Sequence, residues 1–252
     1  MAPSLRALLK NSIDYTGLLP PADVPVGSAI AAFRSYRSGE SNWLLGHFVT
    51  TSRFLSQIPA EFDGVLSVVS NCDFTRAASI ETKLPVATSR PTYCEVPVES
   101  LDEVVRAGSF AKIRTGDAVP ESIPSTENVA DFIATCAMKR LPFKVTGALQ
   151  HPMRSIHPLS HRNGGAHALM HGFLNVLLAA AFAWYGEKQD VLESILNEED
   201  ADAFRFGEKA KWRDMSLDVN QISSVREHFI HSFGSGSFTE PIDYLHKLNL
   251  LT

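Results

Sequence analysis

The chain has 252 residues, of which 44% are hydrophobic, and it carries a formal net charge of −5. This length and composition are sufficient for the core of one barrel-sized domain. The negative net charge excludes the global basic field with which a protein recruits nucleic acid or anionic lipid. The cysteines Cys72, Cys94 and Cys136 are widely spaced and form no CxxC motif. This spacing argues against a disulfide framework or a structural zinc site, and it favours a reducing compartment.

No segment of the sequence has the features of a membrane anchor or an export signal. The first 14 residues contain no long apolar run and no small-residue cleavage pattern, so no signal peptide is expected. The most apolar helical stretch, residues 172–185, is too short to span a bilayer. We therefore expect a cytoplasmic protein without nucleic-acid or membrane partners.

Strands and helices are predicted to alternate along the first 149 residues. The predicted strands are 9–15, 43–49, 62–70, 83–87, 92–98, 110–115 and 142–149. The predicted helices are 28–36, 52–58, a segment capped by Asn71–Asp73 that continues to Ile80, 101–107 and 127–139. After a loop rich in His and Gly that ends near residue 165, the chain is mostly helical. Helices are predicted at 168–185, 191–197 and 219–232 and from Thr239 onward, with one short strand at 203–206.

Alternation at this spacing is typical of βα units, which build a parallel sheet covered by helices. We predict one α/β domain over residues 1–252, a (β/α)8 TIM-barrel-like fold with irregular last units. A doubly wound open sheet is the alternative. No GxGxxG motif or P-loop follows the first strand, which disfavours a nucleotide-binding sheet.

Two similar strands carry the charged residues of greatest interest. The segments FAKIRTG (110–116) and FKVTG (143–147) both place a lysine in an apolar frame and end in Thr-Gly. Side chains alternate along a strand, so the apolar residues face the helices and the charged residues face the barrel interior. The same alternation applies to the strands that contain Asp14 and Glu95. The interior is thus predicted to hold Asp14, Glu95, Lys112, Arg114 and Lys144.

Charges buried in a barrel need a reason, because each costs several kcal/mol unless it is paired. The functional reason is a site at the carboxyl ends of the strands, where barrel enzymes carry their active sites. A salt-bridged network that only fills the interior is one alternative. A strand shifted by one residue, which turns these side chains outward, is another.

A lysine that lies beside other cations in a low-dielectric site loses basicity and becomes a nucleophile toward carbonyls. Lys144 is the first choice for such a Schiff-base lysine, while Lys112 depresses its pKa and Glu95 or Asp14 moves protons. We therefore predict a lyase or aldolase-type enzyme that acts on a small anionic carbonyl compound and needs no cofactor. The residues expected to hold the substrate are Asp14, Arg114, Thr146, His151, Arg154, Gly234, Ser235, Gly236 and Ser237.

The two Lys-strand-Thr-Gly segments resemble the active-site strand of class I aldolases of the deoxyribose-phosphate type, over a few residues in each segment. In that resemblance Lys144 matches the Schiff-base lysine. Four longer segments resemble an uncharacterised bacterial protein family, which implies no activity. They are DYTGLLPPA (14–22), FAKIRTG, FKVTGALQHPMR (143–154) and HGFLNVLLAAA (171–181).

Other features leave further functions open. His167 and His171 stand four residues apart, a spacing that puts both on one helical face as in zinc helices, but no Asp or Glu accompanies them. A metal-assisted isomerase or hydrolase that uses Asp14, Glu95 and histidines is therefore the second hypothesis, although no metal ligand is assigned. A non-catalytic barrel that binds an anionic metabolite is the third. The apolar stretch 172–185 is expected to pack on the barrel wall, with a homo-oligomer interface as the alternative.

Overall fold

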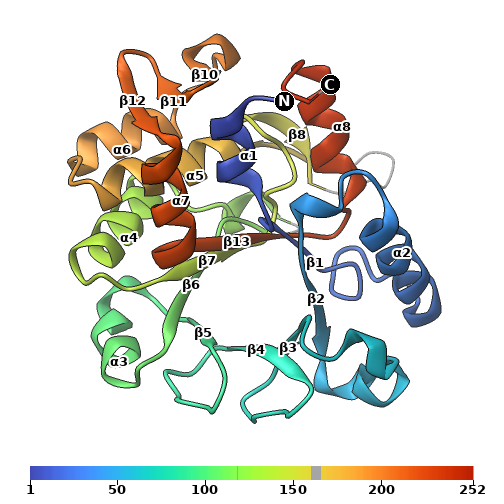
Figure 1. Cartoon of the computed structure of the whole chain (residues 1–252). Helices are drawn as coiled ribbons and strands as arrows, with labels where there is room; N and C mark the ends of the chain where they lie inside the picture. Colours follow the sequence, from blue (N-terminus) through green and yellow to red (C-terminus); the bar gives the residue numbers. More distant parts are fainter. Residues whose placement is uncertain (118, 160–165, 252) are drawn as a thin grey trace.

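The computed structural model describes residues 1–117, 119–159 and 166–251. Eight parallel strands close into a barrel in the order β1-β13-β7-β6-β5-β4-β3-β2 (Figure 1). The strands are β1 (Ile13–Tyr15), β2 (Leu45–Thr51), β3 (Leu66–Val69), β4 (Ala77–Thr82), β5 (Thr92–Glu95), β6 (Phe110–Arg114), β7 (Phe143–Thr146) and β13 (Ile230–Ser235). The predicted (β/α)8 TIM-barrel-like fold is confirmed, and the open-sheet alternative is excluded because the sheet closes on itself.

Helices surround the barrel unevenly. They are α1 (Pro3–Leu9), α2 (Val26–Ser38), α3 (Leu101–Arg106), α4 (Thr126–Met138), α5 (Phe173–Trp184), α6 (Gln189–Leu196), α7 (Val219–His228) and α8 (Thr239–Lys247). No helix lies between β3 and β4 or between β4 and β5, so short loops join these strands at the lower edge of Figure 1. None of the helices in the described ranges is both long and apolar enough to cross a membrane.

Helix α5 is the most buried helix of the protein. Its residues from Phe173 to Ala183 are all buried, and it packs against α4, α6, α7 and β13 of the same chain. Phe173 stacks on Phe233 of β13 with ring centroids 4.8 Å apart. The apolar character of this stretch is therefore explained by its position on the barrel wall.

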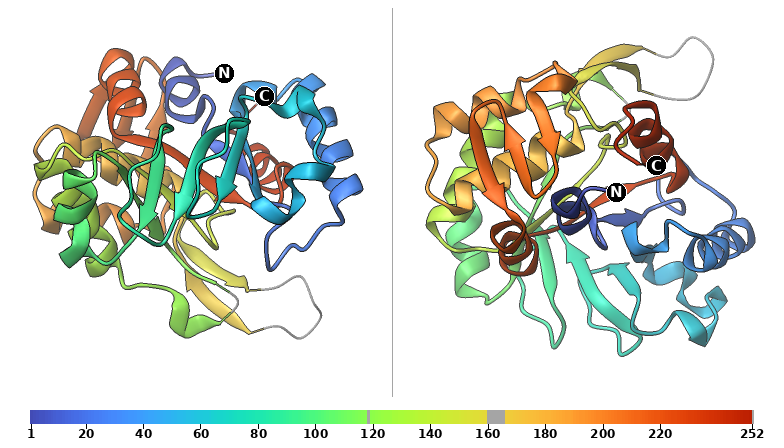
Figure 2. Two further views of the ribbon diagram at one scale, coloured as in Figure 1. Left: turned by 90° about the horizontal axis from the view of Figure 1, so that it is seen from below. Right: turned by 45° about the horizontal axis from the view of Figure 1, so that its top comes forward.

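Most strands of the two small sheets between β7 and β13 were not predicted from the sequence. A hairpin of β8 (Ser155–Pro158) and β9 (His167–Met170) projects from one side of the barrel, as both views of Figure 2 show. A meander follows, formed by β10 (Phe204–Phe206), β11 (Lys209–Trp212) and β12 (Met215–Asp218). The short predicted strand at 203–206 is confirmed, whereas the part of the His- and Gly-containing loop at 160–165 lies outside the described residues.

Several predicted elements are wrong. The segment expected to be a helix up to Ile80 is strand β4, because pairing with β3 on one side and β5 on the other outweighs the local capping pattern at Asn71–Asp73. Residues 83–87 form no strand. Residues 3–9 form helix α1, and the first strand is limited to Ile13–Tyr15. His167 lies in β9 and His171 precedes α5, so the two histidines do not share a helical face.

The start of the last barrel strand, β13, was predicted as the end of the helix at 219–232. Helix α7 ends at His228, and Ile230–Ser235 then forms β13, which closes the barrel between β1 and β7. Phe229, at the end of the helix, has a non-helical backbone with φ −137°. Gly234 and Ser235, which were predicted to lie between two helices, therefore belong to a barrel strand.

Candidate functional site: a charged network inside the barrel

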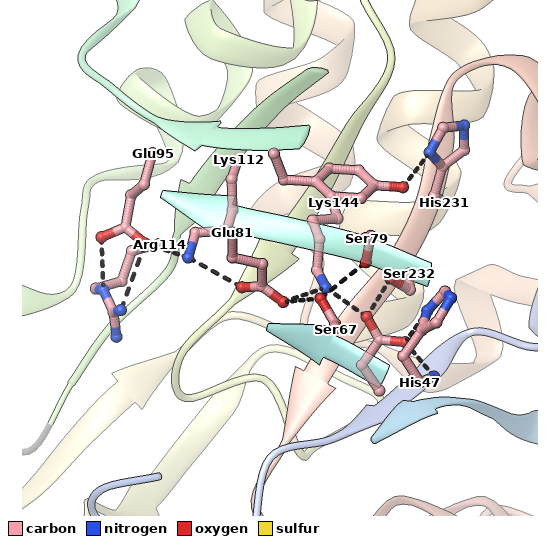
Figure 3. A network of polar contacts seen from close by, with 12 residues as sticks. His47, Ser67, Ser79, Glu81, Glu95, Lys112, Arg114, Lys144, His231 and Ser232 are labelled. Carbon is pink, nitrogen blue, oxygen red and sulfur yellow. Dashed lines mark hydrogen bonds and ion pairs between the residues drawn. The ribbon is translucent and has the colours of Figure 1, made fainter. Parts of the chain in front are cut away.

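Acidic and basic side chains alternate in a continuous network through the barrel interior (Figure 3). At its centre, Lys144 Nζ lies 2.5 Å from Asp14 Oδ2 and 2.7 Å from Glu81 Oε1. The second oxygen of Glu81 lies 3.1 Å from Lys112 Nζ. Glu81 thus bridges two lysines, with one carboxylate oxygen on each.

The network continues from Lys112 to the carboxyl ends of the strands. Lys112 Nζ lies 2.9 Å from Glu95 Oε2. Arg114 donates to both oxygens of Glu95, from Nε at 3.1 Å and from Nη2 at 3.4 Å. Because Glu95 ends β5 and Arg114 ends β6, this part of the network lies at the mouth of the barrel, where the strand arrows of Figure 3 point.

Strand register explains why these side chains meet. Lys112 pairs with Lys144 between β6 and β7, and Glu95 pairs with Lys112 between β5 and β6. Two lysines on adjacent strands repel each other unless an anion separates them, and Glu81 supplies that anion from β4. The predicted inward orientation of Asp14, Glu95, Lys112, Arg114 and Lys144 is confirmed by these contacts.

Sequence reasoning missed the bridging carboxylate and its hydroxyl partners. Glu81 was placed beyond a predicted helix, so its alternation with Ser79 in the segment ASIET was not used. Ser67 Oγ donates to Glu81 Oε1 at 2.8 Å, and Ser79 Oγ donates to Ser67 Oγ at 2.9 Å. Ser232 Oγ donates to Asp14 Oδ2 at 2.7 Å. A reading of ASIET as a strand would have placed Ser79 and Glu81 in the interior.

Solvent exposure rises along the network toward the mouth. The exposed fractions of the side chains are 0% for Asp14, 2% for Lys144, 4% for Glu81, 7% for Lys112, 16% for Glu95 and 39% for Arg114. A molecule that enters from the mouth therefore meets Arg114 and Glu95 first and Lys112 next. Lys144 lies behind all three.

The buried groups remain ionised because their partners outweigh the cost of burial. Burial acts to raise the pKa of Glu81, but Lys144 and Lys112 lower it to about 2. Burial likewise acts to raise the pKa of Asp14, and the neighbouring Lys144 and His47 bring it well below its usual range. Burial acts to lower the pKa of Lys144, but Asp14 and Glu81 raise it well above the ordinary lysine value. The expectation that Lys144 has a depressed pKa is therefore wrong, because it lies between two carboxylates.

The two Thr-Gly segments interlock at the mouth. Thr115 donates two hydrogen bonds to the second segment. Its backbone N–H lies 2.8 Å from the carbonyl oxygen of Thr146, and its Oγ1 lies 2.7 Å from that of Gly147. Gly147 has φ +78°, and a Cβ there would lie 2.1 Å from the carbonyl oxygen of Gly116. A side chain at residue 147 is therefore excluded by both the backbone conformation and the space available.

We expect Gly147→Ala to lower the free energy of unfolding by about 3 kcal/mol, because positive φ and a backbone clash act together. Gly64→Ala is the matched control, since Gly64 has nearly the same φ of +77° with no atom near its added Cβ. The control should lose about 1 kcal/mol. Urea denaturation of both variants measures the difference, and equal losses would show that the contact with Gly116 carries no energy.

The segment 234–237 contains the end of β13 and the turn that leads into α8. Ser235 Oγ donates to the carbonyl oxygen of Ser237 at 2.6 Å, and Ser237 Oγ accepts from the backbone N–H of Glu240 at 3.2 Å in the first turn of α8. A Cβ on Gly234 would lie 3.2 Å from Thr146 Oγ1 and 3.1 Å from Thr16 Cγ2. Gly234 and Thr146 therefore lie together at the mouth. Substrate binding by Gly234, Ser235, Gly236 and Ser237 stays a prediction.

His151 and Arg154 lie on the loop that follows β7. The buried ring of His151 stacks on His157 with centroids 3.3 Å apart and meets the ring of Tyr244 edge-on at 4.6 Å. These rings join the loop to the hairpin β8–β9 and to α8. Arg154 is half-buried, and burial lowers its pKa. Its backbone N–H donates to Asn175 Oδ1 at 3.0 Å. Roles for His151 and Arg154 in substrate binding stay predictions.

Two surface cavities lie away from the network. One of about 330 Å³ is lined by residues that include Arg6, Trp43 and His246, and one of about 300 Å³ is lined by residues that include Met153, Phe204 and Lys247. Neither is lined by a charged residue of the barrel interior. In the ranges 1–117, 119–159 and 166–251, no group of three His, Cys, Asp or Glu side chains is placed to hold a metal ion.

Searches of protein-family models, of curated protein sequences and of solved structures found no match.

Proposed function

We propose that this protein is a lyase of the aldolase type, which acts on a small anionic carbonyl compound through a lysine imine. One observation carries the proposal. Lys112 and Lys144 lie side by side in a parallel barrel, and the carboxylates of Glu81 and Glu95 contact Lys112 near the mouth. An amine with proton acceptors at contact distance is the equipment that imine formation requires.

The geometry favours Lys112 over Lys144 as the reacting amine. Lys144 is only 2% exposed, and two carboxylates hold its proton, so a neutral Lys144 amine is rare. Lys112 is closer to the mouth, and one of its partners, Glu95, is shared with Arg114. Lys144 then acts as a fixed cation that neutralises Glu81 and weakens the hold of that carboxylate on Lys112.

Glu95 can accept and return the proton that imine formation at Lys112 requires. The Lys112 ammonium gives a proton to Glu95, and the neutral Nζ attacks the carbonyl carbon as the C=O π bond opens. A proton of the new ammonium moves to the alkoxide oxygen, which becomes a hydroxyl. Glu95 then returns its own proton to that hydroxyl, which leaves as water when the C=N⁺ bond forms. The iminium then accepts the electron pair of the carbon–carbon or carbon–hydrogen bond that breaks beside it.

The mouth supports an anionic substrate. Arg114 uses Nε and Nη2 for Glu95, while its Nη1 lies 3.7 Å from Asp117 Oδ2. That separation is longer than a charge-assisted hydrogen bond, and both side chains are solvent-exposed. A carboxylate or phosphate on the substrate can therefore compete with Asp117 for this guanidinium nitrogen.

Exchange of α-protons for deuterium tests the proposal, because an iminium acidifies the carbon beside it. The protein is incubated in D2O with a panel of small aldehydes and oxo-acids, and exchange is followed by proton NMR. At least one compound should exchange faster than without protein. Glu95→Gln should slow the exchange about 100-fold, because the proton acceptor is lost. The exposed Glu99 provides the control, and Glu99→Gln should leave the rate unchanged. Absence of exchange across the panel would contradict the proposal.

A non-catalytic barrel that binds an anionic metabolite is the second candidate. The observation in its favour is the raised pKa of Lys144, which is typical of a group held in a permanent ion pair. Catalysis and binding alone are distinguished by whether the bound compound is chemically changed. A compound that binds tightly and is recovered without deuterium favours binding alone.

A further inference from the structure

The charged network reaches solvent at a second place, at the end of the barrel opposite the mouth. His47 is the third residue of β2 and lies near the amino end of that strand. In Figure 3 it lies at the far end of the network from Glu95 and Arg114. Its side chain is 37% exposed, whereas Asp14, which it contacts, is fully buried. His47 is therefore a solvent-accessible titratable group in contact with a buried carboxylate.

A β-bulge directs His47 at Asp14. Ile13 pairs with Leu45 and Tyr15 pairs with Phe48, so Asp14 alone lies opposite two residues, Gly46 and His47. A Cβ on residue 46 would lie 2.3 Å from Asp14 Oδ1, so glycine allows the carboxylate to approach β2. The backbone N–H of His47 donates to that oxygen at 2.8 Å, and its Nδ1 lies 3.2 Å from it.

The two carboxylate oxygens of Asp14 have different partners. Oδ1 faces His47, while Oδ2 accepts from Lys144 at 2.5 Å and from Ser232 at 2.7 Å. We propose that His47 is a positioning residue that controls, through its own protonation, how strongly Asp14 holds the ammonium of Lys144. When His47 is charged, the two cations share one carboxylate, and the attraction between Asp14 and Lys144 weakens. When His47 is neutral, it no longer competes with Lys144 for the negative charge of Asp14.

Five further titratable groups whose pKa depends on the charge of Asp14 keep one charge state between about pH 5 and pH 9. They are Glu81 on β4, Tyr93 on β5, Lys144 on β7, Arg226 on α7 and His231 on β13. The pKa of His231 is lowered to about 4, mainly by burial and also by Arg226, so this second imidazole stays neutral in that range. The pKa of Arg226 is lowered by burial to about 10. An imidazole ordinarily changes charge in this range, and the imidazole of His47 contacts Asp14.

NMR titration of the wild-type protein tests the coupling without substrate. The ¹⁵N resonance of the Lys144 ammonium should move with the same midpoint as the His47 imidazole resonances. The step should vanish in His47→Gln. In Ser232→Ala, which removes a hydrogen bond to Asp14 but no charge, the step should persist. Linkage is reciprocal, so in Lys144→Met the His47 midpoint should rise by about one pH unit.

A Lys144 resonance that does not change across the His47 titration in the wild-type protein would overturn the inference, and that measurement needs no variant. The coupling stands on the contacts of Asp14 alone, and only its effect on turnover rests on the proposed function. If the protein lacks deuterium exchange but shows the coupled titration, the lyase proposal fails and the role of His47 stands. If the protein shows deuterium exchange but the Lys144 and His47 titrations are not coupled, the lyase proposal stands and the role of His47 fails.

Discussion

Replacing Glu81 by glutamine is expected to lower the free energy of unfolding by about 3–5 kcal/mol, because removing one member of a buried ion pair leaves its partner uncompensated. Here the loss affects two partners, since Lys112 and Lys144 each contact one oxygen of Glu81. The amide also has to accept the hydrogen bond from Ser67 that a carboxylate oxygen now accepts. Chemical denaturation at neutral pH measures the effect.

The control for this variant is an exposed ion pair. Glu61 lies 2.6 Å from Arg34, with both side chains about half exposed. Glu61→Gln should cost less than about 1 kcal/mol, because solvent screens such pairs. A loss below about 1 kcal/mol for Glu81→Gln would show that the buried network contributes little to stability.

The same carboxylate predicts a pH dependence of stability. The pKa of Glu81 is lowered from 4.5 to about 2, so the folded state binds its proton more weakly than the unfolded chain does. The stabilisation is therefore fully present above about pH 4.5 and is lost as the pH falls toward 2. A shift of this size corresponds to about 3 kcal/mol. Glu81→Gln should flatten the stability profile over this acidic range.

Lys112→Met is expected to abolish imine formation, whereas the positive charge of Lys144 is expected to matter mainly for stability. Lys112 has the position to react, near the mouth and beside Glu95. Lys144 is held by Asp14 and Glu81 and serves as a cation. Lys112→Met should therefore lower α-proton exchange by at least 1,000-fold, because the covalent step has no substitute nucleophile. Lys139→Met, which changes a partly exposed surface lysine, is the control and should retain the wild-type rate.

Period-two alternation was enough to predict most of the network. Asp14, Glu95, Lys112 and Lys144 all lie in strands whose apolar neighbours face outward, so their inward direction follows from the sequence. The predicted position of the site at the carboxyl ends of β5 and β6 follows from the same alternation and from the barrel fold.

The missing parts depend on tertiary structure. Glu81 was lost because the local pattern before β4 favoured a helix, and only pairing with β3 and β5 makes this segment a strand. His47 was lost because a bulge breaks the alternation of β2, and no periodicity rule predicts where a bulge falls. The shift of the Lys144 pKa was predicted in the wrong direction because it also depends on tertiary structure. The two carboxylates that raise it come from strands distant in sequence, and one of them was unrecognised.

Reductive trapping tests the central claim most directly. The protein is treated with sodium borohydride in the presence of the carbonyl compound that shows the fastest α-proton exchange, and the labelled peptide is sequenced by mass spectrometry. We predict one stable adduct, on Lys112, that is absent from Lys112→Met and still forms in Lys139→Met. An adduct on Lys144, or an adduct that persists in Lys112→Met, would contradict the account.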